Sequence, residues 1–218
     1  DEYYVDSEGK MVTSAWVELK NEEDPDSPET PDTFWYYFEK DGKSAVSKWV
    51  KFDSKWYYFD ESGHMATGKT EIDGATYYLG TEKDGFMRTG WIRLEENSHA
   101  PGASESWYYF NSDGKMVTTQ YDKKIDGSYY TFIDGKMQTG WLLYNNTWYY
   151  LSESGVMVTG WITLGDKAYY LGGDGGMLTG WQNIDGQIYY LYPDGHKAVN
   201  EVIDTFYLDQ DGIWRKPQ

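Results

Sequence analysis

Pairs of tryptophans flank short turns in this chain, and they are its clearest candidates for ligand binding. In WVKFDSKWYYF, Trp49 and Trp56 lie seven residues apart around an Asp53-Ser54 turn. Three further pairs hold the same place in the sequence pattern: Trp16/Trp35, Trp91/Trp107 and Trp141/Trp148. Indole faces attract cations, above all a quaternary ammonium group, which cannot be captured by hydrogen bonding. Flat aromatic rings also stack on sugars, so a polysaccharide is the competing ligand.

Residues for catalysis or metal binding are sparse. The histidines His64, His99 and His196 are isolated from one another, and no HExxH, GxSxG or P-loop pattern occurs. No cysteine is present to act as a nucleophile or a metal ligand. Among 36 carboxylates a glycosidase-like couple could arise by chance, and the SDG, KDG and PDG segments favour turns over calcium loops. We expect a protein that is not an enzyme and that holds no cofactor and no metal.

The formal net charge of -17 limits the partners. Phosphate contacts need Lys or Arg, so the charge disfavours nucleic acid, and it disfavours anionic membrane surfaces as well. The sequence has no apolar stretch of about 18 residues, and it starts at Asp1 without the basic and apolar regions of a signal peptide. We expect a soluble fragment or processed product with no membrane insertion and a neutral or cationic partner.

Internal repeats of about 20 residues cover the chain in about ten copies, counting partial units at both ends. The tryptophans of the TGW segments recur at intervals of 20 residues: Trp141, Trp161 and Trp181. Tyrosine pairs keep the same step: Tyr57-Tyr58, Tyr77-Tyr78, Tyr149-Tyr150, Tyr169-Tyr170 and Tyr189-Tyr190. Aromatics make up 19% of residues and hydrophobics only 39%, which favours an elongated array over a compact layered core.

Each repeat is predicted to be a two-stranded hairpin followed by a loop. Asp73-Gly74, Asn145-Asn146 and Asp185-Gly186 suit the positive φ of a two-residue type I′ turn. Insertions at residues 20–33 and 95–106 both fall at this turn, as tolerated insertions at a hairpin tip do. A lone hairpin is unstable in water, so the hairpins must stack. The sequence predicts an all-β solenoid of stacked hairpins that forms a single domain over residues 1–218.

Strand alternation predicts which way the tryptophans point. Trp49, Lys51, Trp56 and Tyr58 share one face of their hairpin, and Val50, Phe52, Tyr57 and Phe59 share the other. The second face carries no charge, so we expect it to form the core, with the first tyrosine of each pair in it and the tryptophans on the wet face. Paired tryptophans then mark binding sites, whereas the single rings of Trp161, Trp181 and Trp214 are expected to serve packing.

The segment TGWLLYNNTWYYLSESGVMVTGW, residues 139–161, resembles the cell-wall-binding repeat of the choline-binding proteins of Gram-positive bacteria and their phages. The resemblance extends over nearly the whole chain. It implies a left-handed β-solenoid that binds choline residues of teichoic acids between consecutive hairpins. Units such as IDGATYYLG, residues 72–80, and IDGQIYYLY, residues 184–192, look more like the repeats of glucan-binding proteins and clostridial toxins, which implies carbohydrate as the alternative ligand.

The resemblance also implies which residues form each cage: two tryptophans of one hairpin, the second tyrosine of the next, and a methionine. Carried onto this chain, the cages are Trp16, Trp35 and Tyr58; Trp49, Trp56 and Tyr78; Trp91, Trp107 and Tyr130; and Trp141, Trp148 and Tyr170. The matching methionines are Met65, Met87, Met137 and Met177. In IDGSYYTF, residues 125–132, a second register would place Tyr129 and Thr131 outward in place of Tyr130.

Together these features predict a non-catalytic, multivalent module that anchors a secreted or cell-surface bacterial protein to choline-decorated teichoic acid in the cell wall. The partner is then choline or phosphocholine. Two other functions stay open, a carbohydrate-binding repeat module and a structural stalk or adhesin.

Overall fold

The computed structural model describes residues 2–22, 31–95 and 104–215. The chain divides into two compact units, residues 1–117 and residues 118–218, each of which is described by itself. A single domain over residues 1–218 stays a prediction. Within the described residues no helix is both long and apolar enough to cross a membrane.

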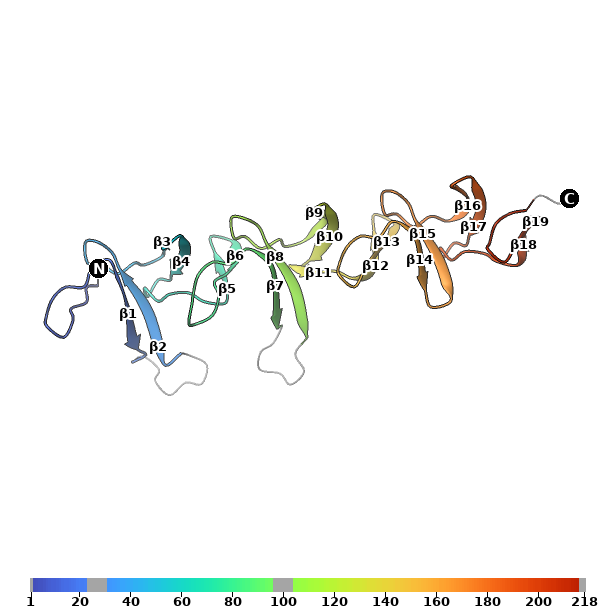
Figure 1. Ribbon diagram of the computed structural model, residues 1–218. Helices are drawn as coiled ribbons and strands as arrows, with labels where there is room; N and C mark the ends of the chain where they lie inside the picture. The colour runs from blue at the N-terminus through green and yellow to red at the C-terminus, as the bar shows by residue number, and fades with distance from the viewer. Residues whose placement is uncertain (1, 23–30, 96–103, 216–218) are drawn as a thin grey trace. The chain divides into compact units, whose positions relative to one another are not determined.

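Antiparallel hairpins make up both units (Figure 1). The first unit pairs β1 (Ala15–Lys20) with β2 (Thr33–Phe38), β3 (Lys48–Phe52) with β4 (Lys55–Phe59), β5 (Lys69–Ile72) with β6 (Ala75–Tyr78), and β7 (Gly90–Glu95) with β8 (Glu105–Phe110). The second unit joins β9 (Gln120–Ile125), β10 (Ser128–Ile133) and β11 (Lys136–Met137) in one sheet, and pairs β12 (Gly140–Tyr144) with β13 (Thr147–Leu151), β14 (Gly160–Leu164) with β15 (Lys167–Leu171), β16 (Gly180–Ile184) with β17 (Gln187–Leu191), and β18 (Glu201–Ile203) with β19 (Phe206–Leu208). The prediction of an all-β fold of repeated hairpins is confirmed.

The predicted hairpin register is also confirmed. Trp49 pairs with Tyr58, as predicted, and the turn residues Asp53 and Ser54 have φ angles of 46° and 64°. Both residues therefore adopt the left-handed conformation of a type I′ turn, which matches the twist of the strands. The two predicted insertions lie largely outside the described residues, but the strand residues that flank them, Lys20↔Thr33 and Glu95↔Glu105, are antiparallel partners.

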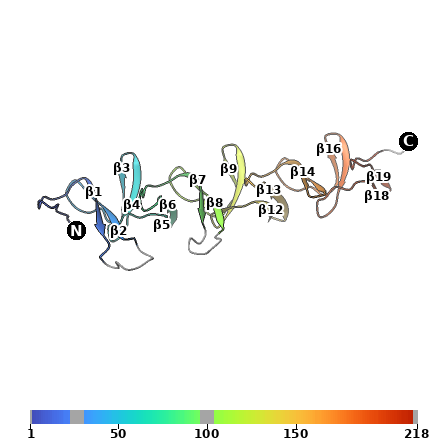
Figure 2. The same cartoon turned by 60° about the horizontal axis from the view of Figure 1, so that its bottom comes forward.

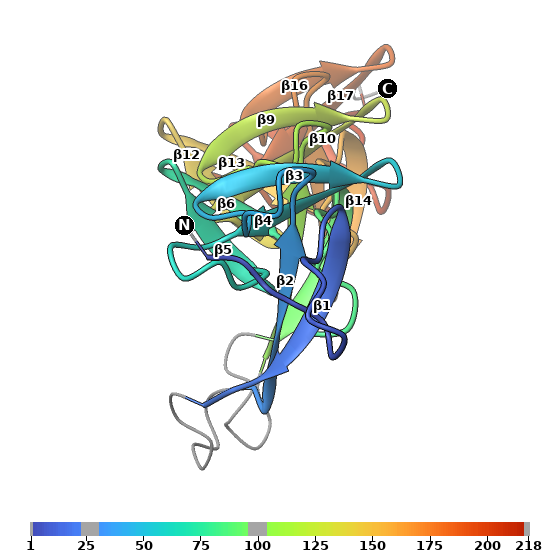
Figure 3. The same cartoon turned by 90° about the vertical axis from the view of Figure 1, so that its left-hand side faces the viewer.

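Successive hairpins point in different directions, and the direction recurs at every third step. In the first unit, β3–β4 projects away from the direction of β1–β2, and β7–β8 returns to it (Figures 2 and 3). In the second unit, β9–β10 and β16–β17 project the same way (Figure 2). Each unit is therefore a helical stack of hairpins.

A recurring backbone hydrogen bond ties the loop after one hairpin to the hairpin of the preceding repeat. The amide of Met65, in the loop after β4, donates to the carbonyl of Trp35 on β2 at 2.8 Å. The same bond joins Met177 to Trp148 at 2.7 Å. The residue that precedes the tyrosine pair thus holds the loop that follows the next hairpin, and it sets the spacing of the stack.

Each hairpin buries one large apolar residue near the end of its second strand. These residues are at most 3% exposed: Phe38, Phe59, Leu79, Phe110, Phe132, Leu151, Leu171, Leu191 and Leu208. The prediction that a whole hairpin face forms the core is wrong for β3–β4, because Phe59 is 0% exposed but Phe52, at the tip of the same face, is 40% exposed. Other tips are buried, since Ile72, Ile125 and Ile184, each directly before its turn, are at most 5% exposed.

The fifth hairpin, β9–β10, adopts the second of the two registers. Asp126 and Gly127 form the turn with φ angles of 48° and 88°. The amide of Met157 donates to the carbonyl of Tyr129 at 2.8 Å, the bond that the second tryptophan accepts in other repeats. Tyr129 is therefore the outward ring and is 40% exposed. The expectation that Thr131 also points outward in this register is wrong: the strand register shifts between Tyr130 and Phe132, and Thr131 is 4% exposed. Tyr130 takes the place of a first tyrosine.

Leu171 and Leu143 provide a matched test of this core. Leu171→Ala should destabilise the protein by about 2 to 5 kcal/mol, because it opens a cavity at a side chain that is fully buried. Leu143 is 52% exposed, so Leu143→Ala should change stability by no more than about 0.5 kcal/mol. Urea denaturation followed by circular dichroism measures both. Equal losses for the two variants would contradict this core assignment.

Candidate functional site

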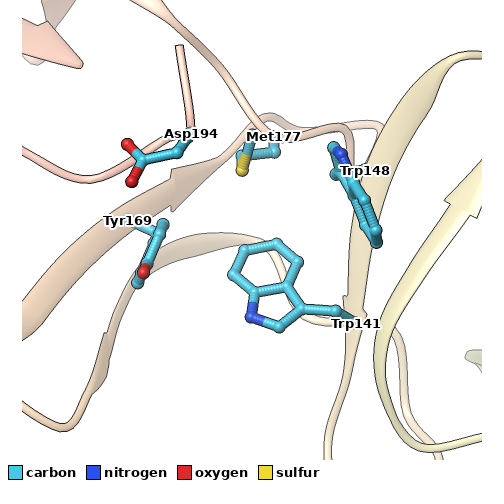
Figure 4. A pocket seen from close by; sticks show the side chains of 5 residues that line it. All are labelled: Trp141, Trp148, Tyr169, Met177 and Asp194. Atoms are coloured by element: carbon cyan, nitrogen blue, oxygen red, sulfur yellow. The ribbon is translucent and has the colours of Figure 1, made fainter. Parts of the chain in front are cut away.

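The clearest site is a cavity of about 320 Å³ in the second unit, lined by Trp141, Trp148, Tyr169, Met177 and Asp194 and called here the Trp141 notch. Its residues come from three consecutive repeats. The two tryptophans lie on β12 and β13 of one hairpin, the tyrosine lies on β15 of the next, and Met177 and Asp194 lie in the loops after β15 and β17. Figure 4 shows the two indoles on one side of the notch and Tyr169 on the other.

The rings of the Trp141 notch meet at steep angles. The Trp141 and Trp148 ring centroids are 6.3 Å apart with planes at 88°, and Trp141 lies 5.1 Å from Tyr169 at 69°. Trp141 is half-buried, whereas Trp148 is 42% exposed. Rings set edge to face leave π faces directed into the space between them. The notch thus offers electron-rich surfaces that are open to a ligand.

Met177 is held in place from two sides. Its amide bonds the Trp148 carbonyl, and its backbone forms a bridge with the buried Leu171. The loop of the next repeat meets its side chain at Gly195, which has a φ of 88°. A Cβ atom at Gly195 would lie 2.2 Å from the Met177 sulfur, far inside van der Waals contact. Glycine at this position therefore lets the loop press the thioether into the notch.

Asp194 places a carboxylate at the edge of the Trp141 notch (Figure 4). Its side chain is hydrogen-bonded to the Nδ1 atom of His196, and the Lys167 ammonium lies 3.4 Å away. Burial raises the pKa of Asp194, but the hydrogen bonds with His196 and the charge of Lys167 outweigh burial and hold this pKa below its ordinary value. A negative charge therefore stands beside the aromatic rings at neutral pH.

The first unit contains two similar aromatic clusters. In the cluster around Trp16, the ring lies 6.4 Å from Trp35 and 4.8 Å from Tyr57 of the next hairpin, and Met65 bonds the Trp35 carbonyl.

In the cluster around Trp49, the ring lies 5.0 Å from Tyr77 of the next hairpin, and the Met87 amide donates to the Trp56 carbonyl at 2.8 Å. Trp56 is 41% exposed, and the Lys51 ammonium lies over its ring at 5.6 Å. Both clusters combine two tryptophans, the first tyrosine of the following repeat and a loop methionine.

The third predicted cage is only partly described. Trp91 and Trp107 lie 6.5 Å apart at 85°, the same geometry as in the Trp141 notch. Tyr130 and Met137 belong to residues 118–218, and the two units are described separately. This cage stays a prediction.

The structure corrects which tyrosine faces the tryptophans. Tyr57, Tyr77 and Tyr169 do so, the first of each pair, and not the predicted Tyr58, Tyr78 and Tyr170. Tyr58 lies instead against Trp49 of its own hairpin at 5.3 Å, Tyr170 against Trp161 at 5.0 Å, and Tyr78 against Phe110 at 6.2 Å.

Strand alternation explains the correction. Tyr170 pairs directly with Trp161 across its own hairpin, so the two rings share a face, and Tyr169 lies on the opposite face. That opposite face packs against the tryptophans of the preceding hairpin. The sequence predicts that this opposite face forms the core, and the first tyrosine is therefore absent from the predicted site. The sequence does predict that the hairpins stack. Stacking brings one face of a hairpin against the preceding hairpin, and this could have indicated that the first tyrosine faces the tryptophans.

Asp194 was also missed, because the PDG segment that contains it predicts only a turn. The segment does form a turn, in which the Gly195 amide donates to the Tyr192 carbonyl at 2.8 Å. No pattern within one repeat shows that this turn reaches a notch built by the two hairpins before it. The carboxylate can be placed only from the relative positions of two repeats, the one that carries the tryptophans and the second repeat after it.

Aromatic clusters recur between consecutive hairpins, and the one around Trp141 contains an open cavity, so the chain is of the class of hairpin-repeat proteins with aromatic junctions. The model of the family described as "choline-binding repeat" matches residues 46–91, 139–179 and 158–202, and that of the "putative cell wall binding repeat" matches residues 103–116. The chain belongs to the family of choline-binding repeat proteins.

Solved structures from Streptococcus pneumoniae are similar to this chain. CbpJ of strain TIGR4 is 31% identical with a TM-score of 0.79, and the match covers 98% of this chain and 75% of CbpJ. Choline binding protein F is 32% identical with a TM-score of 0.75 over the same shares of the two chains. The same protein crystallised in the presence of a peptidoglycan analogue matches at 30% identity and a TM-score of 0.67, over 98% of this chain and 89% of that one. None of the curated proteins compared with the chain matches it.

Two glycines test the clamp on Met177. Gly195→Ala and Gly186→Ala both place an alanine at a φ above 80°, which costs about 1 kcal/mol. Only the alanine at position 195 meets a side chain, since nothing lies within 4 Å of a Cβ at position 186. In spectra of ¹³C-methyl-methionine protein, Gly195→Ala should shift the Met177 signal and Gly186→Ala should leave it in place. The clamp is refuted if both variants, or neither, move that signal.

Proposed function

We propose that this chain is a non-catalytic, multivalent module that anchors a cell-surface or secreted bacterial protein to choline-decorated teichoic acid of the cell wall. The observation that carries the proposal is the Trp141 notch, in which two indoles, a phenol ring, a thioether and a carboxylate surround one open cavity. Membership of the choline-binding repeat family supports the same ligand.

A quaternary ammonium group suits the walls of the Trp141 notch. Its methyl groups carry positive charge but donate no conventional hydrogen bond, so π faces and a polarisable sulfur can replace its hydration. The Asp194 carboxylate adds direct charge attraction at the edge of the notch. Each cation–π contact contributes about 1 to 2 kcal/mol when water is excluded. One such site binds weakly.

Multivalency raises the binding strength of weak sites. The clusters around Trp16 and Trp49 share two tryptophans, a tyrosine and a methionine with the Trp141 notch, and Trp91 with Trp107 is a candidate for a fourth site. A polymer with choline on each repeat can occupy several sites of one chain, so that binding at the second site is intramolecular. The net charge of -17 favours the ammonium over the phosphate of the same polymer.

A carbohydrate ligand is the second candidate, because choline binding protein F was crystallised in the presence of a tetrasaccharide-pentapeptide analogue of peptidoglycan. Stacking on exposed rings such as Trp148 and Trp56 would suit a sugar. A sugar also needs several directed hydrogen bonds, and the notch could offer it the Tyr169 hydroxyl, the indole N–H groups and the Asp194 carboxylate. We favour choline because the π faces, the thioether and the carboxylate together suit a cation that donates no hydrogen bond. A structural stalk would require no open notch of this kind.

Trp148 and Leu143 provide a matched test, since they are cross-strand partners and both are exposed. In a titration with choline followed at the Met177 methyl signal, Trp148→Ala should raise the midpoint about five- to thirtyfold, the equivalent of one lost cation–π contact. Leu143→Ala should leave it unchanged. If choline moves no Met177 signal while a short glucan does, the carbohydrate function is correct and the choline function is wrong.

Removal of the Asp194 charge tests whether this carboxylate contributes to choline binding. Asp194→Asn should raise the choline midpoint at the Met177 signal by about two- to fivefold at low ionic strength, and salt should reduce the difference, because exposed charges are screened beyond about 10 Å at 0.1 M. Glu153→Gln removes one exposed charge that does not line the notch and is the control. A midpoint that Asp194→Asn leaves unaltered at low salt would exclude a role for the carboxylate.

A further inference from the structure

Three consecutive repeats of the second unit build the same junction with different residues in one loop position. That position is occupied by Met177, Lys197 and Trp214, and each amide donates to the tip of an earlier hairpin: to Trp148 at 2.7 Å, to Ala168 at 2.8 Å and to Ile188 at 2.8 Å. The junctions are therefore equivalent in backbone geometry. Their side chains differ, so that two junctions contain an open cavity and one contains a lysine ammonium group.

The middle junction, formed around Trp161, contains a cation of the chain itself. The Lys197 ammonium lies 5.1 Å from the Trp161 ring centroid and 5.8 Å from that of Tyr189. It also donates a hydrogen bond to the carbonyl of Asp211 at 2.8 Å. A primary ammonium needs such an acceptor when it leaves water, and here the chain supplies one. Lys197 thus takes the place that a ligand cation would occupy.

The last junction is open. Trp181, Ile188, Phe206 and Trp214 line a cavity of about 270 Å³, called here the Trp181 notch. The Phe206 ring lies 5.5 Å from Trp181 and 5.8 Å from Trp214, in both cases at 83°. Three rings therefore surround this space, with Trp214 in the position that Met177 takes in the Trp141 notch. Pockets for drug-sized ligands start at roughly 300 Å³, so this slightly smaller cavity suits a head group of a few heavy atoms.

The chemistry of the Trp181 notch selects among cations. Indole, phenyl and aliphatic side chains carry no hydrogen-bond acceptor, so a primary ammonium would lose its water without replacement. A quaternary ammonium loses no such bonds and gains the π faces. The Asp204 carboxylate, which accepts a hydrogen bond from Nε1 of Trp181 at 3.4 Å, puts a negative charge beside one ring. The nearby cation Arg215 is paired with Asp209 at 2.7 Å.

We propose that the Trp181 notch is a further binding site for a quaternary ammonium group, and that the junction around Trp161 is closed to this ligand because Lys197 fills it. The inference rests on the proposed function and extends it. The single rings Trp181 and Trp214, expected from the sequence to serve packing alone, are part of a site. The loop residue at position 177, 197 or 214 decides whether a junction takes an external cation.

Exchange of the loop residues in the full chain tests both the additional site at the Trp181 notch and the closure of the Trp161 junction by Lys197. Equilibrium dialysis counts the choline molecules bound per chain. Trp214→Lys should lower the count by one, because its ammonium closes the notch. Ala168→Trp with Lys197→Met, which copies Trp148 and Met177, should raise the count by one. Ala168→Trp alone is the matched control and should leave the count unchanged, since Lys197 is retained.

Ligand and folding controls complete the experiment. Phe206→Ala removes one ring at a side chain that is 42% exposed and should also lower the count by one, which guards against misfolding of the Trp214 variant. Ethanolamine, a primary ammonium, should not bind at the Trp181 notch, so its count should be the same for the parent chain and for Trp214→Lys. Circular dichroism confirms that each variant keeps its strands.

The outcomes separate this inference from the function on which it rests. An unchanged choline count for both Trp214→Lys and Phe206→Ala overturns the additional site, even when the Met177 signal still responds to choline. A gain for Ala168→Trp alone, or none for the double variant, overturns closure by Lys197. A parent chain that binds no choline at any junction overturns the proposed function and this inference together.

Discussion

Each hairpin in this protein depends on its neighbours, because two strands alone cannot bury their side chains from water. The interaction that meets this need is the aromatic contact between consecutive repeats. Trp141 lies 5.1 Å from Tyr150 of its own hairpin and 5.1 Å from Tyr169 of the next, and the contacts of Trp49 with Tyr58 and Tyr77 are alike. The first tryptophan of a repeat is thus a bridge between hairpins, and the fold exists only as a stack.

The candidate sites are a consequence of the same contact. A bridging indole has one edge buried between two tyrosines, and the second tryptophan of the hairpin stands further out, as Trp148 does at 42% exposed. The loop methionine closes the back of the notch because its amide must bond the tip carbonyl of the earlier hairpin. Stability and binding therefore draw on one set of rings. Core residues such as Leu171 take no part in the notch and can be tested separately.

Variation among the repeats then acts on sites without disturbing the stack. Ala168 and Ile188 replace the second tryptophan in two junctions, yet their carbonyls still accept the loop hydrogen bond, since that bond uses the backbone. The side chain at the position of the second tryptophan can therefore differ between repeats. This separation explains how methionine, lysine and tryptophan can share one loop position, and why the junction around Trp161 holds the Lys197 ammonium whereas the junction around Trp181 contains an open cavity.

The sequence by itself determined the repeat, the all-β hairpins, their turns and the tryptophan pairs, because each of these is a local property. Alternation along a strand and the positive φ of Asp53-Ser54 or Asn145-Asn146 need only neighbouring residues. Tertiary structure decided which tyrosine faces Trp141, that Asp194 reaches the same notch, and that Lys197 lies on Trp161. These facts join residues from two or three repeats, and the rotation between hairpins that brings them together is set by packing, which no pattern within one repeat contains.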